Sequence, residues 1–283
     1  MRDVECVEFL RWALPRLGMR WRGFRRVRRQ VCRRVDRRLR ELGLADAAAY
    51  RSHLESNPGE WTVLAGLCRV TISRFYRDRA VFDALRDDVL PQLCAGARAE
   101  PPRTLRCWSA GCGSGEEAYS LSMLFRLCLA PRFPELRLRV RATDIDDAVL
   151  ARARRGVFAA GALRELPEDW RARAFDETDA GWRIRPAFRA PIEFFREDVC
   201  APRPDPEDRF HLVLCRNLAF TYFETDLQRQ VLGRLAERIR PGGALVLGIH
   251  ESLPPDAPGF APWHARLRIF RRLGAATRGS ESA

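Results

Sequence analysis

A glycine-rich loop between an apolar strand and a helix constrains this chain more than any other segment. Residues 104–110, TLRCWSA, are typical of a β-strand, and the loop GCGSG separates them from a helix predicted from Glu116 to about Leu129. Glycine adopts positive φ readily and lets a ligand approach the main chain closely. In open α/β sheets, ligands bind at such loops beyond the carboxyl ends of the strands. The loop therefore predicts a ligand site, although a plain tight turn would use the same residues.

The segments after this loop alternate between strands and helices. Further strands are predicted over 138–144, 192–198, 210–216, 243–248 and 266–272, and helices over 146–155 and 224–239. This alternation is typical of an α/β fold with a doubly wound, mostly parallel, Rossmann-like sheet. Residues 157–190 interrupt the alternation and contain a predicted hairpin around Asp179–Gly181. We interpret them as a small inserted β-containing subdomain.

The part of the chain before residue 70 is predicted to be entirely helical. Apolar residues recur there at spacings of three and four, which predicts helices over 4–17, 24–42, 46–56 and 59–68. A linking helix is predicted over 79–94, and the glycine and prolines of 95–103 predict a loop. We therefore divide the chain into a basic all-helical domain (1–70), a linking, cofactor-contacting segment (71–103), an α/β domain (104–273) and a disordered tail (274–283).

The charge of the chain indicates an acidic partner. Its 50 basic residues are all arginine, and they exceed the 37 acidic residues to give a net charge of +13. A basic surface favours nucleic acid, a membrane face or a carboxylate-rich protein as partner. No apolar run approaches the roughly 18 residues that a transmembrane helix needs. The N-terminal segment is amphipathic, unlike a signal peptide, so a cytoplasmic location is expected.

The cysteines and histidines give no sign of a metal centre. The nine cysteines form no C-x-x-C pair, and most of them, such as Cys107, Cys128 and Cys215, lie in apolar stretches. We expect buried, reduced thiols. The four histidines are far apart in the sequence, and no spacing typical of metal ligands is present. No metal site is predicted.

Carboxylates around the glycine loop narrow the class of ligand. No Lys-Ser or Lys-Thr follows the loop, which excludes a P-loop, and Glu116 and Glu117 begin the helix instead. Two carboxylates would repel a phosphate but favour a sulfonium or ammonium cation, although one of them is explained by the helix dipole alone. Asp144, at the end of the next predicted strand, is placed to bond the hydroxyls of a ribose, and Asp146 to cap the following helix.

Together these residues resemble the chemotaxis-receptor glutamate O-methyltransferase family (CheR). The likeness covers roughly residues 5–272. It rests on six ordered motifs, which are RRVRRQVCRRVDRRLRELGL (25–44), TISRFYRD (71–78), WSAGCGSGEEAYS (108–120), the D-I-D of 144–146, CRNLAFTYF (215–223) and a P-G-G-x-L-x-L-G-x-x-E pattern over 241–251. Their order and spacing make a chance agreement negligible. The resemblance implies a class I methyltransferase domain behind the helical domain.

The resemblance also implies the cofactor and its contacts. The cofactor would be S-adenosyl-L-methionine, with S-adenosyl-L-homocysteine as product. The implied cofactor-binding residues are Thr71, Ser73, Arg77, Gly111, Gly113, Glu117, Asp144, Asp198, Val199, Arg216, Asn217 and Leu218. Ser73 and Asp198 are mild departures from the residues common in the family. The block 215–223 is one residue longer than the common form between Asn217 and Tyr222, which bears on the identity of the acceptor.

The activity implied by the resemblance is methylation of glutamate carboxylates in chemoreceptors. A glutamate with its reference pKa of about 4.3 is already ionised near neutral pH, so the reaction requires no general base. Arg77 and Tyr222 are the implied catalytic residues, since Arg77 could hold the substrate carboxylate and Tyr222 could orient its oxygen. Arginines of the basic helix would bind the acidic helical substrate, and we select Arg29, Arg33, Arg37 and Arg40. A monomer is expected.

Two other functions remain open from the sequence. The positive charge is compatible with a nucleic-acid methyltransferase, although no N/D-P-P-Y-like tetrapeptide is present. The altered acceptor block is compatible with a non-catalytic regulatory module that binds the cofactor. In some family members the inserted subdomain docks a receptor's C-terminal peptide, and residues 157–190 would be the corresponding part.

Overall fold

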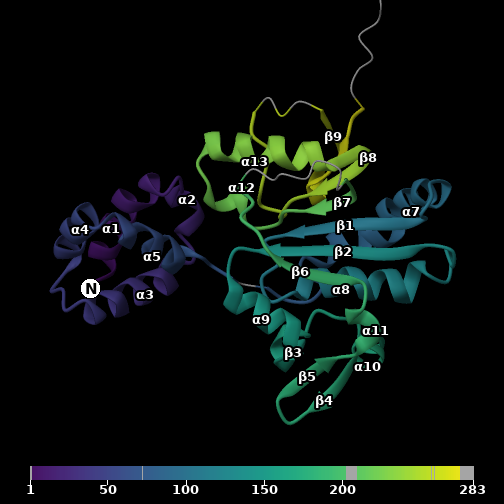
Figure 1. Ribbon diagram of the computed structural model, residues 1–283, viewed down its shortest axis with the longest axis horizontal. Helices are drawn as coiled ribbons and strands as arrows, with labels where there is room; N and C mark the ends of the chain where they lie inside the picture. The colour runs from purple at the N-terminus through teal and green to yellow at the C-terminus, as the bar shows by residue number, and fades with distance from the viewer. Residues whose placement is uncertain (1, 72, 202–208, 256, 258, 275–283) are drawn as a thin grey trace, which may run out of the picture. The chain divides into compact units, whose positions relative to one another are not determined.

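The computed structural model describes residues 2–71, 73–201, 209–255, 257 and 259–274, which form two compact units (Figure 1). The helical unit comprises Met1–Thr71 and Leu218–Gln228. The sheet unit comprises Ile72–Asn217 and Arg229–Ala283. Within the described ranges, no helix is long and apolar enough to cross a membrane. Apart from Gly274, the predicted disordered tail (274–283) lies outside the described residues.

Five helices of the first 70 residues build the helical unit. They are α1 (Asp3–Arg16), α2 (Trp21–Phe24), α3 (Arg28–Glu41), α4 (Ala47–Ser56) and α5 (Pro58–Cys68). Helix α3 buries Val31, Val35 and Leu39, whose spacing of four residues aligns them on one face. The helix predicted over 24–42 is wrong at its start, because residues 25–27 form a turn between α2 and α3.

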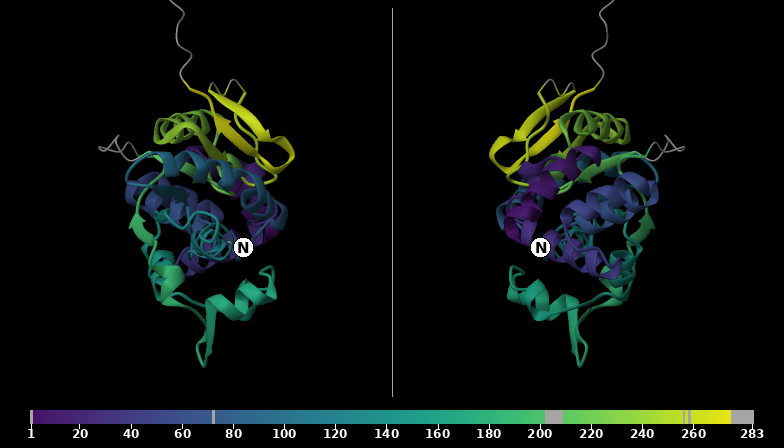
Figure 2. Two further views of the ribbon diagram at one scale, coloured as in Figure 1. Left: turned by 90° about the vertical axis from the view of Figure 1, so that its right-hand side faces the viewer. Right: turned by 90° about the vertical axis from the view of Figure 1, so that its left-hand side faces the viewer.

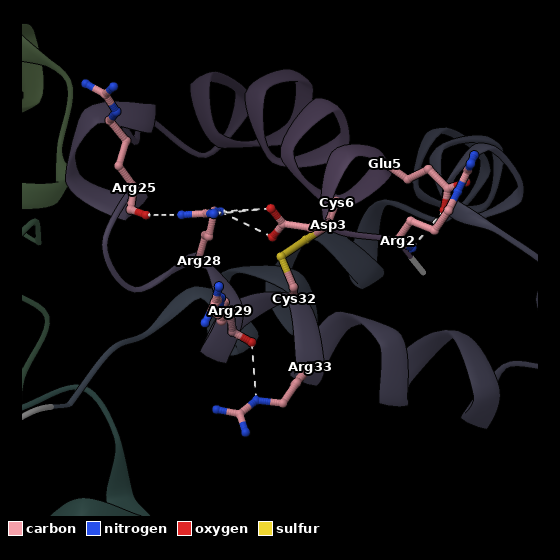
Figure 3. The surroundings of a disulfide bond; sticks show 9 residues. All are labelled: Arg2, Asp3, Glu5, Cys6, Arg25, Arg28, Arg29, Cys32 and Arg33. Carbon is pink, nitrogen blue, oxygen red and sulfur yellow. Dashed lines mark hydrogen bonds and ion pairs between the residues drawn. A yellow bond between two sulfur atoms is a disulfide. The ribbon is translucent and has the colours of Figure 1, made fainter.

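A disulfide bond corrects the prediction that the cysteines are reduced. Cys6 of α1 and Cys32 of α3 are joined, with their Cα atoms 5.9 Å apart (Figure 3). The two cysteines are 26 residues apart in sequence, and only the packing of α1 against α3 brings them within bonding range. An ion pair between Arg28 and Asp3, 3.2 Å from Nη2 to Oδ2, links the same two helices. The other seven cysteines form no disulfide bond, and Cys107 and Cys215 are buried as predicted, whereas Cys128 is only half-buried.

The disulfide predicts the number of reactive thiols. Protein purified and denatured without reductant should react with a thiol reagent at seven cysteines, and at nine after reduction. The double variant Cys6→Ser/Cys32→Ser should give seven before and after reduction. Nine reactive thiols in the unreduced wild-type protein would show that Cys6 and Cys32 are not bonded to each other.

A seven-stranded sheet forms the centre of the sheet unit (Figure 1). Its strands are β1 (Thr104–Ala110), β2 (Arg137–Asp144), β6 (Ile192–Arg196), β7 (Phe210–Leu214), β8 (Ile239–Val246), β9 (Phe260–His264) and β10 (Ile269–Arg272). The order is β6-β2-β1-β7-β8-β10-β9, and the first five strands are parallel to one another. The predicted Rossmann-like, mostly parallel sheet is confirmed. Strand β9 was not predicted, because its Pro262 is unusual in a strand and is tolerated here at the edge of the sheet.

The helices of this unit are α6 (Arg79–Ala84), α7 (Leu90–Ala99), α8 (Glu116–Leu124), α9 (Asp147–Arg155) and, from residue 229 on, most of α13 (Thr225–Arg238). Two π-helical segments, Leu85–Val89 and Phe125–Leu129, continue α6 into α7 and extend α8. The loop predicted over 95–103 begins only after Ala99. Ala97 is buried in the core there, and alanine favours the helix.

The predicted inserted subdomain is a three-stranded sheet with two short helices. Its strands are β3 (Val157–Phe158), β4 (Phe175–Thr178) and β5 (Gly181–Ile184), in the order β3-β5-β4, with α10 (Glu168–Ala174) and α11 (Pro186–Arg189) beside them. The hairpin β4–β5 turns at the predicted place and projects from the sheet unit (Figure 2). Phe75 anchors this subdomain, because its ring packs edge-on against those of Phe158 and Phe175, with ring centroids 4.7 and 5.2 Å apart.

Candidate cofactor site at the carboxyl edge of the sheet

The carboxyl ends of the five parallel strands lie at one edge of the sheet. The turns after β1, β2, β6 and β7 carry most of the predicted site residues, and their side chains therefore gather at this edge. This is the edge at which open α/β sheets bind ligands. Of the predicted cofactor-binding and catalytic residues, Thr71, Leu218 and Tyr222 belong to the helical unit, as do the four predicted substrate-binding arginines of α3.

The glycine loop is held against the end of β2 by its own backbone. The amides of Gly111 and Cys112 both donate to the carbonyl oxygen of Thr143, each at 2.8 Å. Gly111, Gly113 and Gly115 have φ values of 74°, 55° and 92°. The φ of Gly115 favours glycine, and a Cβ there would also lie 3.0 Å from the ring of Tyr119, which is a crowded contact.

Asp144 fastens the loop to the end of β2. Its Oδ2 accepts a hydrogen bond from the amide of Gly113 at 2.9 Å, and its Oδ1 accepts one from the amide of Asp146 at 3.0 Å. Asp146 caps α9 as predicted, because its Oδ1 accepts from the amide of Ala148 at 2.8 Å. Asp144 thus presents a carboxylate of fixed orientation beside the glycine loop. Its ribose contact stays a prediction.

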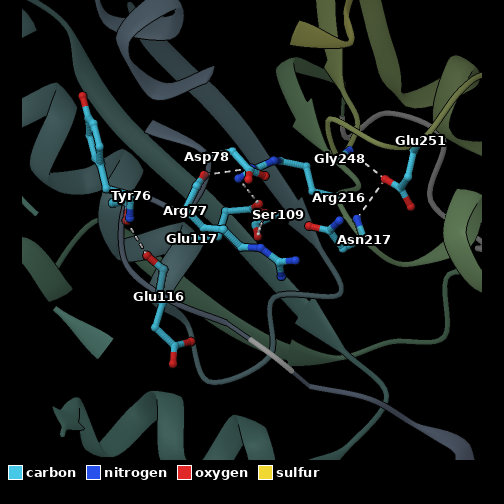
Figure 4. A network of polar contacts seen from close by, with 11 residues as sticks. Tyr76, Arg77, Asp78, Ser109, Glu116, Glu117, Arg216, Asn217, Gly248 and Glu251 are labelled. Atoms are coloured by element: carbon cyan, nitrogen blue, oxygen red, sulfur yellow. Dashed lines mark hydrogen bonds and ion pairs between the residues drawn. The ribbon is translucent and has the colours of Figure 1, made fainter. Parts of the chain in front are cut away.

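A buried arginine joins three segments of the site (Figure 4). The side chain of Arg216 is only 3% exposed. Its Nη2 donates to Oδ2 of Asp78 at 2.6 Å and to the carbonyl oxygen of Arg77 at 2.8 Å, and its Nη1 contacts Oε2 of Glu117 at 3.3 Å. The other carboxylate oxygen of Glu117 accepts a hydrogen bond from the hydroxyl of Ser109 at 2.6 Å. Arg216 therefore orients Glu117 and the Arg77–Asp78 backbone together.

The segment 73–78 lies along the start of α8. The amide of Tyr76 donates to the hydroxyl of Ser120 at 2.9 Å, and Phe75 and Tyr76 are fully buried. Tyr76 and Asp78 have positive φ values of 55° and 61°, so the segment turns sharply on either side of Arg77. Tertiary contacts therefore place the predicted residues Ser73 and Arg77 in the same unit as the glycine loop.

Glu251 is a site residue to which the sequence assigned no role. It is 2% exposed, and its Oε2 accepts hydrogen bonds from the amides of Asn217 and Gly248 at 2.8 and 2.6 Å (Figure 4). Asn217 has a φ of 56°, and a Cβ at Gly248 would lie 2.5 Å from its Nδ2. The buried carboxylate stabilises the left-handed turn at Asn217. The motif over 241–251 contained this glutamate, which was the available signal.

The remaining predicted contacts belong to different units of the chain. Asp198 and Val199 follow β6, and Oδ1 of the exposed Asp198 accepts from the amide of Cys200 at 2.8 Å. Tyr222 lies in the helical unit, where its ring packs on that of Phe24 at 4.9 Å. The adenine and acceptor roles of these residues stay predictions.

The arginines of α3 divide into two groups. The four predicted substrate-binding residues are all exposed, and they are Arg29, Arg33, Arg37 and Arg40. Arg34 and Arg38 instead serve the fold, since Arg34 donates to the carbonyl oxygens of Leu67 and Arg69, while Arg38 pairs with Glu60 at 2.8 Å. Arg37 and Arg40 form exposed ion pairs with Glu41 and Asp36 of the same helix. The exposed face of α3 is therefore a basic surface, and its contact with an acidic partner stays a prediction.

Family models match both parts of the chain. The model described as "CheR methyltransferase, SAM binding domain" matches residues 71–266, and "CheR methyltransferase, all-alpha domain" matches residues 27–66. The chain belongs to the CheR methyltransferase family. It is accordingly a methyltransferase that uses S-adenosyl-L-methionine, and the predicted cofactor and family are confirmed.

Three relatives illustrate the similarity. A chemotaxis protein methyltransferase of Listeria monocytogenes is 34% identical over 71% of this chain and 72% of its own length. Chemotaxis protein methyltransferase 1 of Pseudomonas aeruginosa is 30% identical over 79% of this chain and 81% of its own. An uncharacterized 104.1 kDa protein of Rhodobacter capsulatus is 36% identical over 86% of this chain, which spans about a quarter (25%) of that longer protein.

The two glutamates that begin α8 have different surroundings in this CheR-family protein. Glu117 is oriented by Arg216 and Ser109, whereas Glu116 is 7% exposed and its Oε2 is buried without a hydrogen-bond partner. Burial raises the pKa of Glu116, and a hydrogen bond with Ser73 opposes the shift. Of the two, Glu117 is therefore the one held in the ion-paired network of the site.

Because the pKa of Glu116 is raised, replacing this residue should change the stability of the protein in a pH-dependent way. Above the unfolded-state pKa of 4.5, the folded protein is penalised for ionising a buried carboxyl, so Glu116→Gln should stabilise it at pH 8 and lose this advantage toward pH 4. We expect a gain on the order of 1 kcal/mol at pH 8, as for relieving a buried unsatisfied group. Urea unfolding at both pH values measures it, with the exposed Glu168→Gln as control. An equal effect of Glu116→Gln at both values would contradict the prediction.

Proposed function

We propose that this protein methylates glutamate side chains in an acidic helical protein, namely the cytoplasmic signalling domains of chemoreceptors. The observation that carries the proposal is the site itself, in which the carboxylates Glu117 and Asp144 are fixed beside a glycine loop in a CheR-family chain. The names of relatives such as the Listeria and Pseudomonas chemotaxis methyltransferases support this acceptor. The reaction would take place in the cytoplasm.

The residues of the sheet unit fit the proposed cofactor. Gly111 and Gly113 expose their backbone, Asp144 offers a carboxylate at the ribose position, and Glu117 offers one at the start of α8. The acidic character of this set suits a cation better than a phosphate. When bound, S-adenosyl-L-methionine supplies a methyl group on a positively charged sulfur.

The chain's own residues have to position the acceptor rather than activate it. A glutamate carboxylate is already a nucleophile at neutral pH, so catalysis depends on alignment and on exclusion of water. Arg77 would hold one carboxylate oxygen through its planar guanidinium. The hydroxyl of Tyr222 would donate to the acceptor and orient the attacking oxygen. The exposed arginines of α3 would bind the acidic surface around the modified glutamate.

The test is methyl transfer from labelled S-adenosyl-L-methionine into membrane and soluble fractions of the native host. Mild alkali releases methanol from carboxyl esters but not from N-methyl groups, so alkali-labile label on a membrane protein of receptor size supports the proposal. Tyr222→Phe should lower kcat about 10²-fold or more while the cofactor still binds. Arg77→Ala should lower kcat to a similar extent and also weaken cofactor binding, because Arg77 is an implied cofactor contact as well. Alkali-resistant label, or label on nucleic acid only, would show that the acceptor is a different one.

A charge reversal on α3 tests the acceptor surface separately. Arg33→Glu should weaken transfer to the receptor fraction, most strongly at low ionic strength, because exposed charges are screened by salt. The matched control is Arg98→Glu, which reverses another exposed arginine, on α7. An equal loss for both variants would mean that only net charge matters.

A further inference from the structure

The segment that carries Tyr222 is built into the helical unit by residues near its second helix. Tyr222 ends α12 (Ala219–Tyr222), a single helical turn that follows Leu218. A helix this short leaves its last carbonyl groups without intrahelical partners and is not stable alone. Its conformation therefore depends on donors from elsewhere in the chain.

Arg20 supplies three of these donors. Its backbone amide donates to the carbonyl oxygen of Tyr222 at 2.8 Å, its Nε donates to that of Thr221 at 3.1 Å, and its Nη2 donates to that of Phe220. One residue, about 200 positions away in sequence, thus satisfies three consecutive carbonyl groups at the end of α12. The guanidinium plane suits this task, because its donors point in fixed directions.

The backbone on either side reinforces this attachment. Met19 and Phe223 form an antiparallel β-bridge, and the amide of Glu224 donates to the carbonyl oxygen of Gly18 at 2.8 Å. The buried side chain of Gln228 donates through Nε2 to the carbonyl oxygen of Phe223 at 2.8 Å. Residues 18–20 and 222–224 therefore pair like two short strands.

Gly23 allows α2 and α12 to approach closely. A Cβ at this position would lie 2.3 Å from the carbonyl oxygen of Thr221, a contact that no side chain could relieve by rotating. The next residue, Phe24, packs its ring against that of Tyr222. The absence of a side chain at Gly23 is what permits this ring contact.

We propose that Arg20 and Gly23 are positioning residues for methyl transfer, which act by holding the Tyr222 ring in place. This inference rests on the proposed function, in which Tyr222 orients the acceptor carboxylate. It adds a second task to the helical unit, which would position a catalytic side chain as well as bind the substrate. Neither residue contacts the reacting atoms in this proposal.

Kinetics of Arg20→Ala test the proposal, with Arg22→Ala as the matched control because Arg22 is an exposed neighbour on α2. We expect kcat to fall about 10–100-fold in Arg20→Ala, as for a catalytic group displaced by about 1 Å. Arg22→Ala should keep the wild-type kcat. Arg20→Lys should recover part of the loss, since an ammonium can satisfy some of the carbonyl groups.

A double-mutant cycle separates positioning from a general loss of structure. If Arg20 acts through the Tyr222 hydroxyl, Arg20→Ala should lower kcat far less in a Tyr222→Phe background than in the wild type. Independent, multiplicative effects of the two substitutions would overturn the proposal. Gly23→Ala provides a second variant, and it should show the same coupling to Tyr222→Phe.

The outcomes distinguish this inference from the proposed function. A wild-type chain that methylates no acidic protein overturns the proposed function and the inference with it. A wild-type chain that is active, with full kcat retained in both Arg20→Ala and Gly23→Ala, overturns the inference alone. A lower kcat that couples to Tyr222 supports both.

Discussion

Replacing Arg216 by methionine should lower the free energy of unfolding of the sheet unit by about 3 kcal/mol or more, as expected when one partner of a buried ion-pair network is removed. Methionine keeps the apolar stem but leaves Asp78 and Glu117 without their shared guanidinium. It also leaves the carbonyl group of Arg77 without its donor. Chemical denaturation followed by tryptophan fluorescence, to which the buried Trp108 contributes together with the chain's six other tryptophans, measures the loss.

Two comparisons show whether this loss comes from the buried network. Arg240 forms a solvent-exposed ion pair with Glu100, and Arg240→Met should cost less than about 1 kcal/mol. Adding Asp78→Asn and Glu117→Gln to Arg216→Met should restore part of the stability, because it removes the unpaired charges. A loss at Arg216 no larger than that at Arg240 would mean that water replaces the guanidinium without penalty.

Acidification should destabilise the protein through His211. This residue of β7 is 8% exposed, and its Nδ1 accepts a hydrogen bond from the amide of Arg106 at 3.1 Å. Burial, assisted by the nearby charge of Arg240, lowers the pKa of His211 from 6.5 to about 4. The unfolded chain therefore binds a proton at His211 between pH 6.5 and 4, whereas the folded protein does not.

The sign of this effect follows from the two pKa values of His211. The free energy of unfolding rises with pH wherever the unfolded state binds more protons than the folded state. The stability that depends on neutral His211 is therefore complete above pH 6.5 and is lost progressively toward pH 4. A shift of this size corresponds to about 3 kcal/mol. The stability difference between wild type and His211→Gln should therefore change by about 3 kcal/mol between pH 7 and pH 4.

A matched histidine controls this experiment. His250 is exposed, and His250→Gln serves as the control for replacing a histidine by glutamine at the protein surface. Thermal or urea unfolding at intervals of half a pH unit is sufficient to resolve the difference. A constant offset between wild type and His211→Gln at all pH values would show that His211 ionises equally in the folded and unfolded chains.

Much of the fold was predictable because local patterns specified it. The strand Thr104–Ala110 agrees with its prediction at both ends, since an apolar run and a glycine loop bound it. The helix α9 begins after the capping Asp146 and ends at Arg155, just before Gly156, which has a φ of 66°. These signals act over a few residues, so one segment at a time suffices to find them.

Features that depend on distant segments could not be predicted in this way. The disulfide needs Cys6 and Cys32 on two packed helices, and neither cysteine has a local signature. Glu116 and Glu117 are identical neighbours in the sequence, yet the fold buries one without a partner at Oε2 and pairs the other with Arg216. Burial and pairing are properties of the assembled core.

The sequence by itself determined the family, the order of the elements, the glycine loop and the carboxylates around it, because these are encoded by residue types at fixed spacing. Only the tertiary structure decided that Leu218–Gln228 groups with the helical unit, although it follows a strand of the sheet. It likewise decided that Arg20 caps the turn that carries Tyr222. The physical reason is that a single helical turn takes its stability from whichever donors packing brings to it, and packing joins residues that the sequence keeps apart.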